Sequence, residues 1–343
     1  MTESKSTIES KHVEKKTTKI KSASPEEQPL EGKSDGSKLD ADTAIAQSEN
    51  KNAPMAVPVL TPEGAELSNQ EAIRLLEEEV TKKNKRISNK ENWRHGVFNG
   101  NVALPGGVKL EMVPIPAGEF LRNDGKTVRL TKSYWLGKYE VTNEQWQAVM
   151  SDRRASQDGK DLSDPSKWKG AKRPVEGVSW NDAMDFCKRL NKLYADKLPQ
   201  GYRFDLPTEA QWEYACRAGT TTDYSYGIAA NSDKMNYDGN YSDSGSKGIY
   251  RAETVDVGSL GYKNAFGLYD MHGNVWEWCR DWYGSYGGDT TDPTGPATGS
   301  LRVRRGGSWF SSAKDCRSTD RYDFDPSYRN SFLGFRLALV HVQ

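Results

Sequence analysis

The first 92 residues of this 343-residue chain lack aromatic side chains, because every Trp (10), Tyr (16) and Phe (9) lies at or after Trp93. Large apolar side chains are also scarce in residues 1–60, which are rich in Lys, Glu, Ser, Asp, Thr and Pro. Such a segment cannot bury enough apolar surface to offset the loss of chain entropy on folding. We therefore expect residues 1–67 to form a disordered arm or tether.

Residues 68–91 are expected to form a short amphipathic helix and a linker. Ser68 and Glu71 have the spacing of a capping box, and a stripe of three apolar residues follows. So thin a stripe favours docking on the chain's own domain over binding a partner. The folded domain then occupies residues 92–343.

Several signals that would define a partner or a compartment are missing. No apolar run approaches the ~20 residues that span a bilayer, so we expect no transmembrane segment. The 48 basic and 48 acidic side chains balance, and a neutral chain predicts no nucleic-acid partner. The first residues, TESKSTIESK, carry neither the apolar stretch of a secretory signal nor a cysteine for a lipid. We expect a cell-surface location only if a signal or lipid anchor has been removed.

Cysteine pairs with metal-binding or redox spacing are also missing. Cys187, Cys216, Cys279 and Cys316 are far apart and form no CxxC motif. This spacing argues against a structural zinc site and against a thioredoxin-type dithiol. We expect four buried free thiols.

From Leu110 onward, short alternating apolar runs and frequent glycine predict short strands, mostly antiparallel. Three helix starts stand between them, each with a capping residue three positions before its partner: Thr142 with Gln145, Ser179 with Asp182, and Thr208 with Gln211. Few helices, short strands and long irregular loops indicate an α+β domain. The stretch 219–263 is too long for an unsupported loop, so metal ions or tight packing must hold it.

Four motifs in this domain resemble one known family. They are PVEGVSWNDAMDFCKRLN (174–191), YRFDLPTEAQWEYACRAGT (202–220), NAFGLYDMHGNVWEWCRDWY (264–283) and the pair RVRRGGSW (302–309) and LGFRLAL (333–339). Their order and spacing are similar to those of the formylglycine-generating enzyme, or sulfatase-modifying factor, family. The resemblance implies a C-type-lectin-like fold, which enzymes and pure binding proteins share.

The resemblance also implies how an enzyme of this family would work. Two thiolates five residues apart would bind copper(I), a soft ion that prefers sulfur ligands. Here Cys316 occupies the second position and Ser311 the first, so the copper site is incomplete and we predict that the protein is not an enzyme. An iron-dependent branch of the superfamily needs histidine ligands, and His272 is better explained as a packed loop residue. A copper-dependent oxidase that uses Cys316 and an unrecognised second thiol stays open as the alternative.

A structural calcium site is implied by the same resemblance. Asp270, Gly273, Val275 and Glu277 match the family's calcium position, where side-chain oxygens and backbone carbonyls supply hard ligands. The alternative is that Asp270 and Glu277 are ordinary turn carboxylates. Their place within a run of tryptophans favours calcium.

The region 302–339 contains a second pattern. Trp309, Arg317, Arg321, Arg329 and Arg336 belong to the scaffold, and the positions of interest between them use only Phe, Ser, Asp, Tyr and Asn. These fourteen positions are Phe310, Ser311, Ser312, Asp315, Asp320, Tyr322, Asp323, Phe324, Asp325, Ser327, Tyr328, Asn330, Ser331 and Phe332. All five residue types have codons that differ from AAC only in the first two bases, as adenine-directed mutagenesis would produce.

This bias resembles the variable proteins of diversity-generating retroelements, in which exposed residues are exchanged on a fixed lectin-like scaffold. Tyr and Phe offer rigid contact area, while Ser, Asn and Asp offer adaptable hydrogen bonds. The simpler explanation is that Ser and Asp are common in loops and that Phe310 or Phe332 belongs to the core. We predict a monomeric, non-enzymatic protein that binds a protein or cell-surface ligand through these fourteen positions.

Overall fold

The structure is a computed structural model that describes Glu78 and residues 98–152, 161–288 and 290–342. The predicted arm and the predicted helix with its linker lie outside these residues, except for Glu78, which is helical and exposed. Within the described ranges, every helix is too short or too polar to cross a lipid bilayer.

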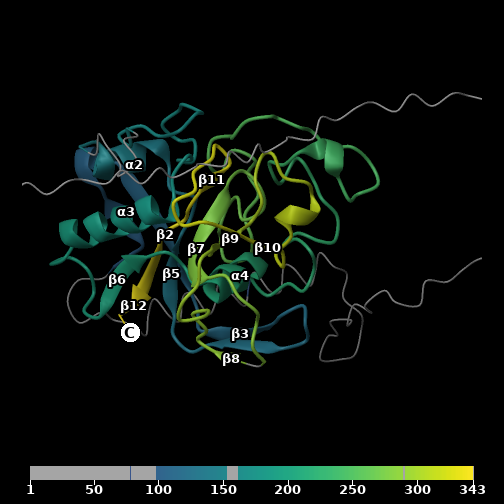
Figure 1. Ribbon diagram of the computed structural model, residues 1–343, viewed down its shortest axis with the longest axis horizontal. Helices are drawn as coiled ribbons and strands as arrows, with labels where there is room; N and C mark the ends of the chain where they lie inside the picture. Colours follow the sequence, from purple (N-terminus) through teal and green to yellow (C-terminus); the bar gives the residue numbers. More distant parts are fainter. Residues whose placement is uncertain (1–77, 79–97, 153–160, 289, 343) are drawn as a thin grey trace, which may run out of the picture. The chain divides into compact units, whose positions relative to one another are not determined.

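Three sheets of short strands form the framework (Figure 1). The five-stranded sheet has the order β1 (Asn101–Ala103), β2 (Lys109–Ile115), β5 (Tyr134–Gly137), β12 (Ala338–His341) and β6 (Tyr202–Asp205). The four-stranded sheet has the order β10 (Arg321–Phe324), β9 (Arg302–Arg305), β7 (Trp276–Trp282) and β11 (Leu333–Gly334). The three-stranded sheet has the order β3 (Gly118–Leu121), β4 (Thr127–Leu130) and β8 (Thr290–Thr291). The β11–β7 and β4–β8 pairs are parallel and the other pairs of these sheets antiparallel, which confirms the mostly antiparallel prediction.

The described α-helices begin at the predicted caps. They are α2 (Asn143–Met150), α3 (Trp180–Leu193) and α4 (Glu209–Arg217). Each cap, Thr142, Ser179 or Thr208, accepts a hydrogen bond from the backbone N–H of the third helical residue, whose side chain accepts from the backbone N–H of the cap. The short turns η1 (Pro105–Gly107), η2 (Gly239–Tyr241) and η3 (Lys314–Cys316) complete the elements. The α+β prediction is confirmed.

Strand β7 contributes to two apolar clusters because its side chains alternate between the faces of the sheet. Trp276 and Trp278 pack into a cluster in which the rings of Trp146, Phe186 and Phe335 meet at centroid distances of 5.5 to 6.2 Å. Cys279 packs into the other cluster, around Trp212 of α4. Strand β7, which pairs with β9 and β11, is therefore packed on both faces.

The long segment 219–263 is held by packing against the C-terminal region. Tyr224, Met235 and Tyr237 form an apolar cluster with Ala313 and Cys316. The hydroxyl of Tyr224 donates a hydrogen bond to the carbonyl oxygen of Ala313 at 2.8 Å. Tight packing, one of the two supports expected from the sequence, is therefore present.

Candidate ligand-binding site

All four cysteines are buried and free, as predicted. Cys316 lies directly against the backbone of Gly307, where a Cβ atom would clash with its Sγ. Burial raises the pKa of the Cys316 thiol well above its usual range. Without a metal ion this environment favours the protonated thiol, whereas nucleophilic cysteines react as the thiolate.

Ser311 is the one predicted contact residue that is buried, with 9% of its surface exposed. Its Oγ accepts a hydrogen bond from the backbone N–H of Ser308 at 3.1 Å, and its carbonyl oxygen accepts from the N–H of Asp238 at 2.9 Å. Ser311 is therefore buried and bonded to the backbone around it, unlike the exposed contact that we expected, and its part in ligand binding stays a prediction. A loop lacks the regular alternation that would reveal an inward side chain.

His272 is fully bonded inside the domain. Its Nδ1 lies 2.8 Å from the carbonyl oxygen of Cys316, and its Nε2 accepts the backbone N–H of Ser225 at 3.0 Å. Burial lowers the pKa of His272 to about 4, so the ring is neutral at physiological pH. The expectation of a packed loop residue is confirmed.

The other thirteen predicted contact positions are at least partly accessible. Five are exposed: Phe310, Tyr322, Asp325, Ser327 and Tyr328. Eight are partly exposed: Ser312, Asp315, Asp320, Asp323, Phe324, Asn330, Ser331 and Phe332. Strand alternation places Asp323 on the same face of β10 as Arg321, opposite to Tyr322 and Phe324. The remaining twelve residues are called the contact patch below.

Tyr322 anchors the part of the contact patch that lies on β10. Opposite it on β9 is Arg304, whose guanidinium carbon lies 4.1 Å from the ring centroids of both Trp276 and Phe324, and 5.4 Å from that of Tyr322. The hydroxyl of Tyr322 donates to Oδ1 of Asp315 at 2.7 Å, which joins β10 to η3. Burial lowers the pKa of Arg304 to about 10, so it stays charged beneath the rings.

Arg304 and Trp276 are therefore support residues that the sequence analysis missed. The alternation of the RVRR run was visible, but the residue opposite Arg304 is set by the pairing of β9 with β10. That register depends on the whole sheet and cannot be read from either strand alone.

A second group of rings continues the contact patch. The ring of Phe324 lies 4.1 Å from that of Tyr328 and 6.3 Å from that of Phe332. Nε1 of Trp309 donates to the carbonyl oxygen of Ser331 at 2.9 Å, so the segments around positions 309 and 331 are adjacent. Phe324 and Phe332 also pack against the core, which partly supports the simpler explanation for Phe332.

The arginines predicted to hold the scaffold each form ion pairs with carboxylates outside the segment 309–336. We call Arg317, Arg321, Arg329 and Arg336 the arginine frame. Arg321 binds Glu209 with two hydrogen bonds of 2.6 and 2.7 Å, and Nε of Arg329 donates to Asp182 at 2.6 Å. Because α4 and α3 carry these carboxylates, the backbone of the contact patch is tied to both helices.

The predicted calcium ligands lie beside a surplus of buried carboxylates. Glu140, Asp270 and Glu277 are all buried, and Arg336 pairs with Glu277 at 2.8 Å. Burial, followed by the charges of Asp270 and Glu277, raises the pKa of Glu140 well above its usual range. This surplus of negative charge fits a divalent cation held by oxygen ligands.

The same residues limit how such a cation could be held. In the described part of the chain, no three His, Cys, Asp or Glu side chains converge as metal ligands. Backbone carbonyls of Gly273 and Val275 would have to complete the site, and Glu277 also accepts from Nε1 of Trp212 at 2.7 Å. Calcium at Asp270, Gly273, Val275 and Glu277 stays a prediction.

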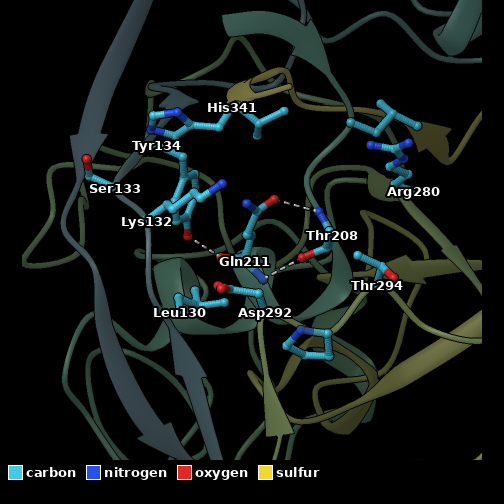
Figure 2. A pocket seen from close by; sticks show the side chains of 13 residues that line it. Leu130, Lys132, Ser133, Tyr134, Thr208, Gln211, Arg280, Asp292, Thr294 and His341 are labelled. Carbon is cyan, nitrogen blue, oxygen red and sulfur yellow. Dashed lines mark hydrogen bonds between the residues drawn. The ribbon is translucent and has the colours of Figure 1, made fainter. Parts of the chain in front are cut away.

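Two cavities lie elsewhere, and none of the fourteen predicted positions lines either of them. Figure 2 shows the smaller, of about 70 Å³, where Gln211 and Thr208 form the α4 capping box and the hydroxyl of Tyr134 donates to the carbonyl oxygen of Gln211. It is far below the size of ordinary ligand pockets. The larger, of about 350 Å³, is lined by Phe120, Tyr286 and the Glu209–Arg321 pair among others.

The family comparison agrees with the motifs. Residues 104–340 match the family described as "Sulfatase-modifying factor enzyme 1-like domain". The formylglycine-generating enzyme of Mus musculus is 27% identical over 296 residues, covering 68% of this chain and 76% of that enzyme. The serine/threonine-protein kinase pkn1 of Chlamydia caviae is 32% identical over 260 residues, covering 66% of this chain. The chain spans only 38% of the length of this kinase and of its Chlamydia pneumoniae counterpart.

Solved structures confirm the fold. Treponema denticola variable protein 1 superposes with a TM-score of 0.56 and 31% identity, covering 69% of this chain and 97% of that protein. PvdO from Pseudomonas aeruginosa gives a TM-score of 0.54 and 26% identity, covering 67% of this chain and 94% of PvdO. The chain therefore belongs to the sulfatase-modifying factor enzyme 1-like family and has the C-type-lectin-like fold that it shares with the treponemal variable protein.

Proposed function

We propose that this protein is a non-enzymatic ligand-binding protein whose contact patch is diversified on a fixed scaffold, as in the variable proteins of diversity-generating retroelements. The observation that carries the proposal is that residues 309–336 combine ion-paired arginines with exposed aromatic side chains. The arginine frame is bonded to the rest of the domain, while Phe310, Tyr322 and Tyr328 are 59%, 39% and 37% exposed. Exposed aromatic residues on a fixed backbone bind at a low cost in conformational entropy.

A binding array tests this proposal. The full chain and a Phe310→Ala, Tyr322→Ala, Tyr328→Ala variant are applied to arrayed extracellular proteins and glycans, with Leu121→Ala as the control. Leu121 is 55% exposed on β3, in another sheet. We expect the triple variant to lose the wild-type signals and the control to keep them. Signals that survive in the triple variant would contradict the proposal.

The oxidase alternative is disfavoured by the state of its two key positions. Ser311 offers a hydroxyl, a poor ligand for copper(I), which accepts a hydrogen bond from the backbone N–H of Ser308, and burial raises the pKa of the Cys316 thiol. Incubation of the full chain with copper and a cysteine-containing sulfatase peptide should therefore yield no aldehyde. Aldehyde formation that disappears in Cys316→Ala would establish the enzyme instead.

A further inference from the structure

The cavity of about 350 Å³ lies apart from the contact patch, none of whose residues lines it. Its wall is formed by β3 and β4, the N-terminal half of α4, one residue of β10 and the segments 281–287 and 290–296. Volumes of this size hold small organic molecules, which bind through apolar walls and a few placed polar groups. Apolar surface is supplied here by Phe120, Val128 and Pro296, among others.

One wall of this cavity is a loop that two arginines fix in place. Nη1 of Arg321 donates to the carbonyl oxygen of Gly284, and Nη2 of Arg122 donates to that of Gly287, both at 2.7 Å. Between these glycines, the ring of Tyr286 contacts both guanidinium groups. Its centroid lies 3.9 Å from Cζ of Arg122 and 4.2 Å from Cζ of Arg321. The wall is therefore bonded in advance, which lowers the entropic cost of binding a ligand.

The two arginines are poor partners for an anionic ligand, because carboxylates of the protein already neutralise them. Nε and Nη2 of Arg321 donate to Glu209 at 2.6 and 2.7 Å. Nε of Arg122 donates to Asp124 at 3.0 Å. A carboxylate or phosphate that enters the cavity would have to displace one of these ion pairs.

Asp281 is the carboxylate of the wall that has no cationic partner. Glu209 pairs with Arg321, and Glu213 pairs with Arg217 at 2.9 Å. Among the described residues, no ion pair involves Asp281, although only 4% of its surface is exposed. Its Oδ2 accepts the backbone N–H of Glu209 at 2.9 Å. Burial, followed by the charge of Glu209, raises the pKa of Asp281 to about 7.

The surroundings of Asp281 leave this carboxylate uncompensated. Two arginines are near enough for their charges to act on it, but both are bonded elsewhere. Arg280 pairs with Asp205 at 2.8 Å, and Arg302 donates to the carbonyl oxygen of Arg280 at 2.6 Å. A Cβ at Gly295 would lie 3.1 Å from Oδ1 of Asp281, so glycine keeps the space beside this oxygen free of a side chain. A cation bound there would offset the cost of burying the charge.

An organic ammonium ion suits this site better than a metal ion. Metal ions of the calcium type need several oxygen ligands, and in the described part of the chain no three acidic, histidine or cysteine side chains converge as metal ligands. An ammonium group needs only one carboxylate for a charge-assisted hydrogen bond. Its hydrocarbon body would bury apolar surface against the rest of the wall.

We propose that this cavity binds a small organic ammonium ion, whose charged group lies at the carboxylate of Asp281 and whose apolar body contacts Phe120, Val128 and Pro296. The inference goes beyond the proposed function and does not depend on it, because the cavity and the contact patch share no residue. The protein would thus have two separate recognition sites.

Matched fragments test the ligand class. The full chain is titrated in an amine-free buffer at pH 8, where Asp281 is mostly ionised, and binding is followed by ligand-observed NMR. One series is phenethylamine, neutral 2-phenylethanol and anionic phenylacetate, and the other is tryptamine, tryptophol and indole-3-acetate. We expect at least one amine to bind about tenfold or more tightly than its alcohol, with its carboxylate weakest. Equal binding of amine and alcohol in both series, or no binding by either amine, would overturn the proposal.

Substitutions in the wall then locate the bound amine. Asp281→Asn keeps an oxygen for the N–H of Glu209 but removes the charge, so it should weaken amine binding about tenfold and leave alcohol binding unchanged. A purely structural role of Asp281 would weaken both ligands alike. Asp164→Asn, which removes a carboxylate that is 44% exposed, is the control and should bind both ligands as the wild type does.

Phe120→Ala is a second variant that does not disturb the buried carboxylate. Loss of the apolar contact should weaken the amine and its alcohol by a similar factor. Thermal unfolding of each variant checks that it is folded. Amine binding within about twofold of the wild type in either folded variant, Asp281→Asn or Phe120→Ala, would overturn the assignment of this cavity.

Discussion

The arginine frame and the contact patch occupy the same stretch of chain, yet they differ in almost every physical respect. Arg336 is fully buried and donates to Glu277 and to the carbonyl oxygens of Gly137 and Tyr269, whereas Phe310 is mostly exposed. Removing an arginine of the arginine frame leaves a buried carboxylate without its partner. Exchanging a residue of the contact patch changes mainly the solvent-exposed surface. Side chains that are bonded to the rest of the domain and side chains that are exposed to solvent are thus interspersed in one segment.

The largest effect should come from breaking the frame at Arg336. We expect Arg336→Ala to lower the free energy of unfolding by about 3–5 kcal/mol, because Glu277 would remain buried without its partner. Urea denaturation measures the change. Arg129→Ala, which removes an exposed pair with Glu119, is the control and should have little effect. A similar, small loss in both variants would mean that the frame does not carry the stability of this segment.

Calcium bound at the buried carboxylates should stabilise the fold. If the ion binds at Asp270 and Glu277, excess calcium at about 100 times Kd should stabilise the fold by roughly 2.7 kcal/mol and raise the melting temperature by several degrees. Chelation with EDTA should reverse the rise, and Asp270→Asn should abolish it. An identical melting temperature with calcium and with EDTA would exclude a structural ion there.

Substitution of Gly307 measures how tightly the backbone packs against Cys316. Gly307 and Gly106 both have φ near +75°, but a Cβ would clash with Cys316 only at Gly307. Both alanine variants should pay about 1 kcal/mol for the left-handed backbone. Gly307→Ala should lose roughly 1–3 kcal/mol more through overpacking, measured by thermal unfolding. Equal losses would show that Cys316 can move aside.

Glu176 should make the stability of the domain sensitive to pH. Its Oε1 accepts the backbone N–H of Trp168, whose ring packs on Trp309 at 5.9 Å, and burial raises its pKa from 4.5 to about 7. The folded state therefore holds this proton more tightly than the unfolded state, so stability falls as pH rises from about 4.5 to 7. Urea denaturation at pH 5 and pH 8 should show a fall that is larger in the wild type than in Glu176→Gln by on the order of 1–3 kcal/mol, because burial also raises the pKa values of Asp270 to about 6 and of Asp281 to about 7 in both proteins. An equal fall in both proteins would assign the titration to another group.

The smallest effects should come from exchanges within the patch. We expect Phe310→Ser, Ser327→Asn and Tyr328→Asp each to change the free energy of unfolding by no more than about 0.5 kcal/mol. Thermal unfolding of the three single variants checks this. A fall of more than about 2 kcal/mol in the free energy of unfolding of any variant would show that this side chain stabilises the fold.

The sequence predicted what depends on local signals. The three capping boxes needed only a hydroxyl and a partner three residues later, and their helices begin where expected. Burial of Ser311 was missed because its bonds to Ser308 and Asp238 depend on loop geometry. The contact between Tyr241 and Ala313 joins segments about seventy residues apart, for which one sequence carries no periodic signal. The exposed positions of the contact patch could be predicted from composition. The residues beneath them, Arg304 and Trp276, could be found only from the strand pairing of the assembled sheet.

The alternation along β10 has a consequence for how this segment can evolve. Arg321 faces Glu209 of the first turn of α4, and Tyr322, its neighbour, faces the opposite side of the sheet. Inserting or deleting a single residue between β9 and Arg321 while the strand pairing is kept would reverse both directions at once, so that the guanidinium would point outward and the phenol toward the helix. Exchanges at Tyr322 and Phe324 are therefore compatible with the fold only while Arg321 and the length of the strand are kept.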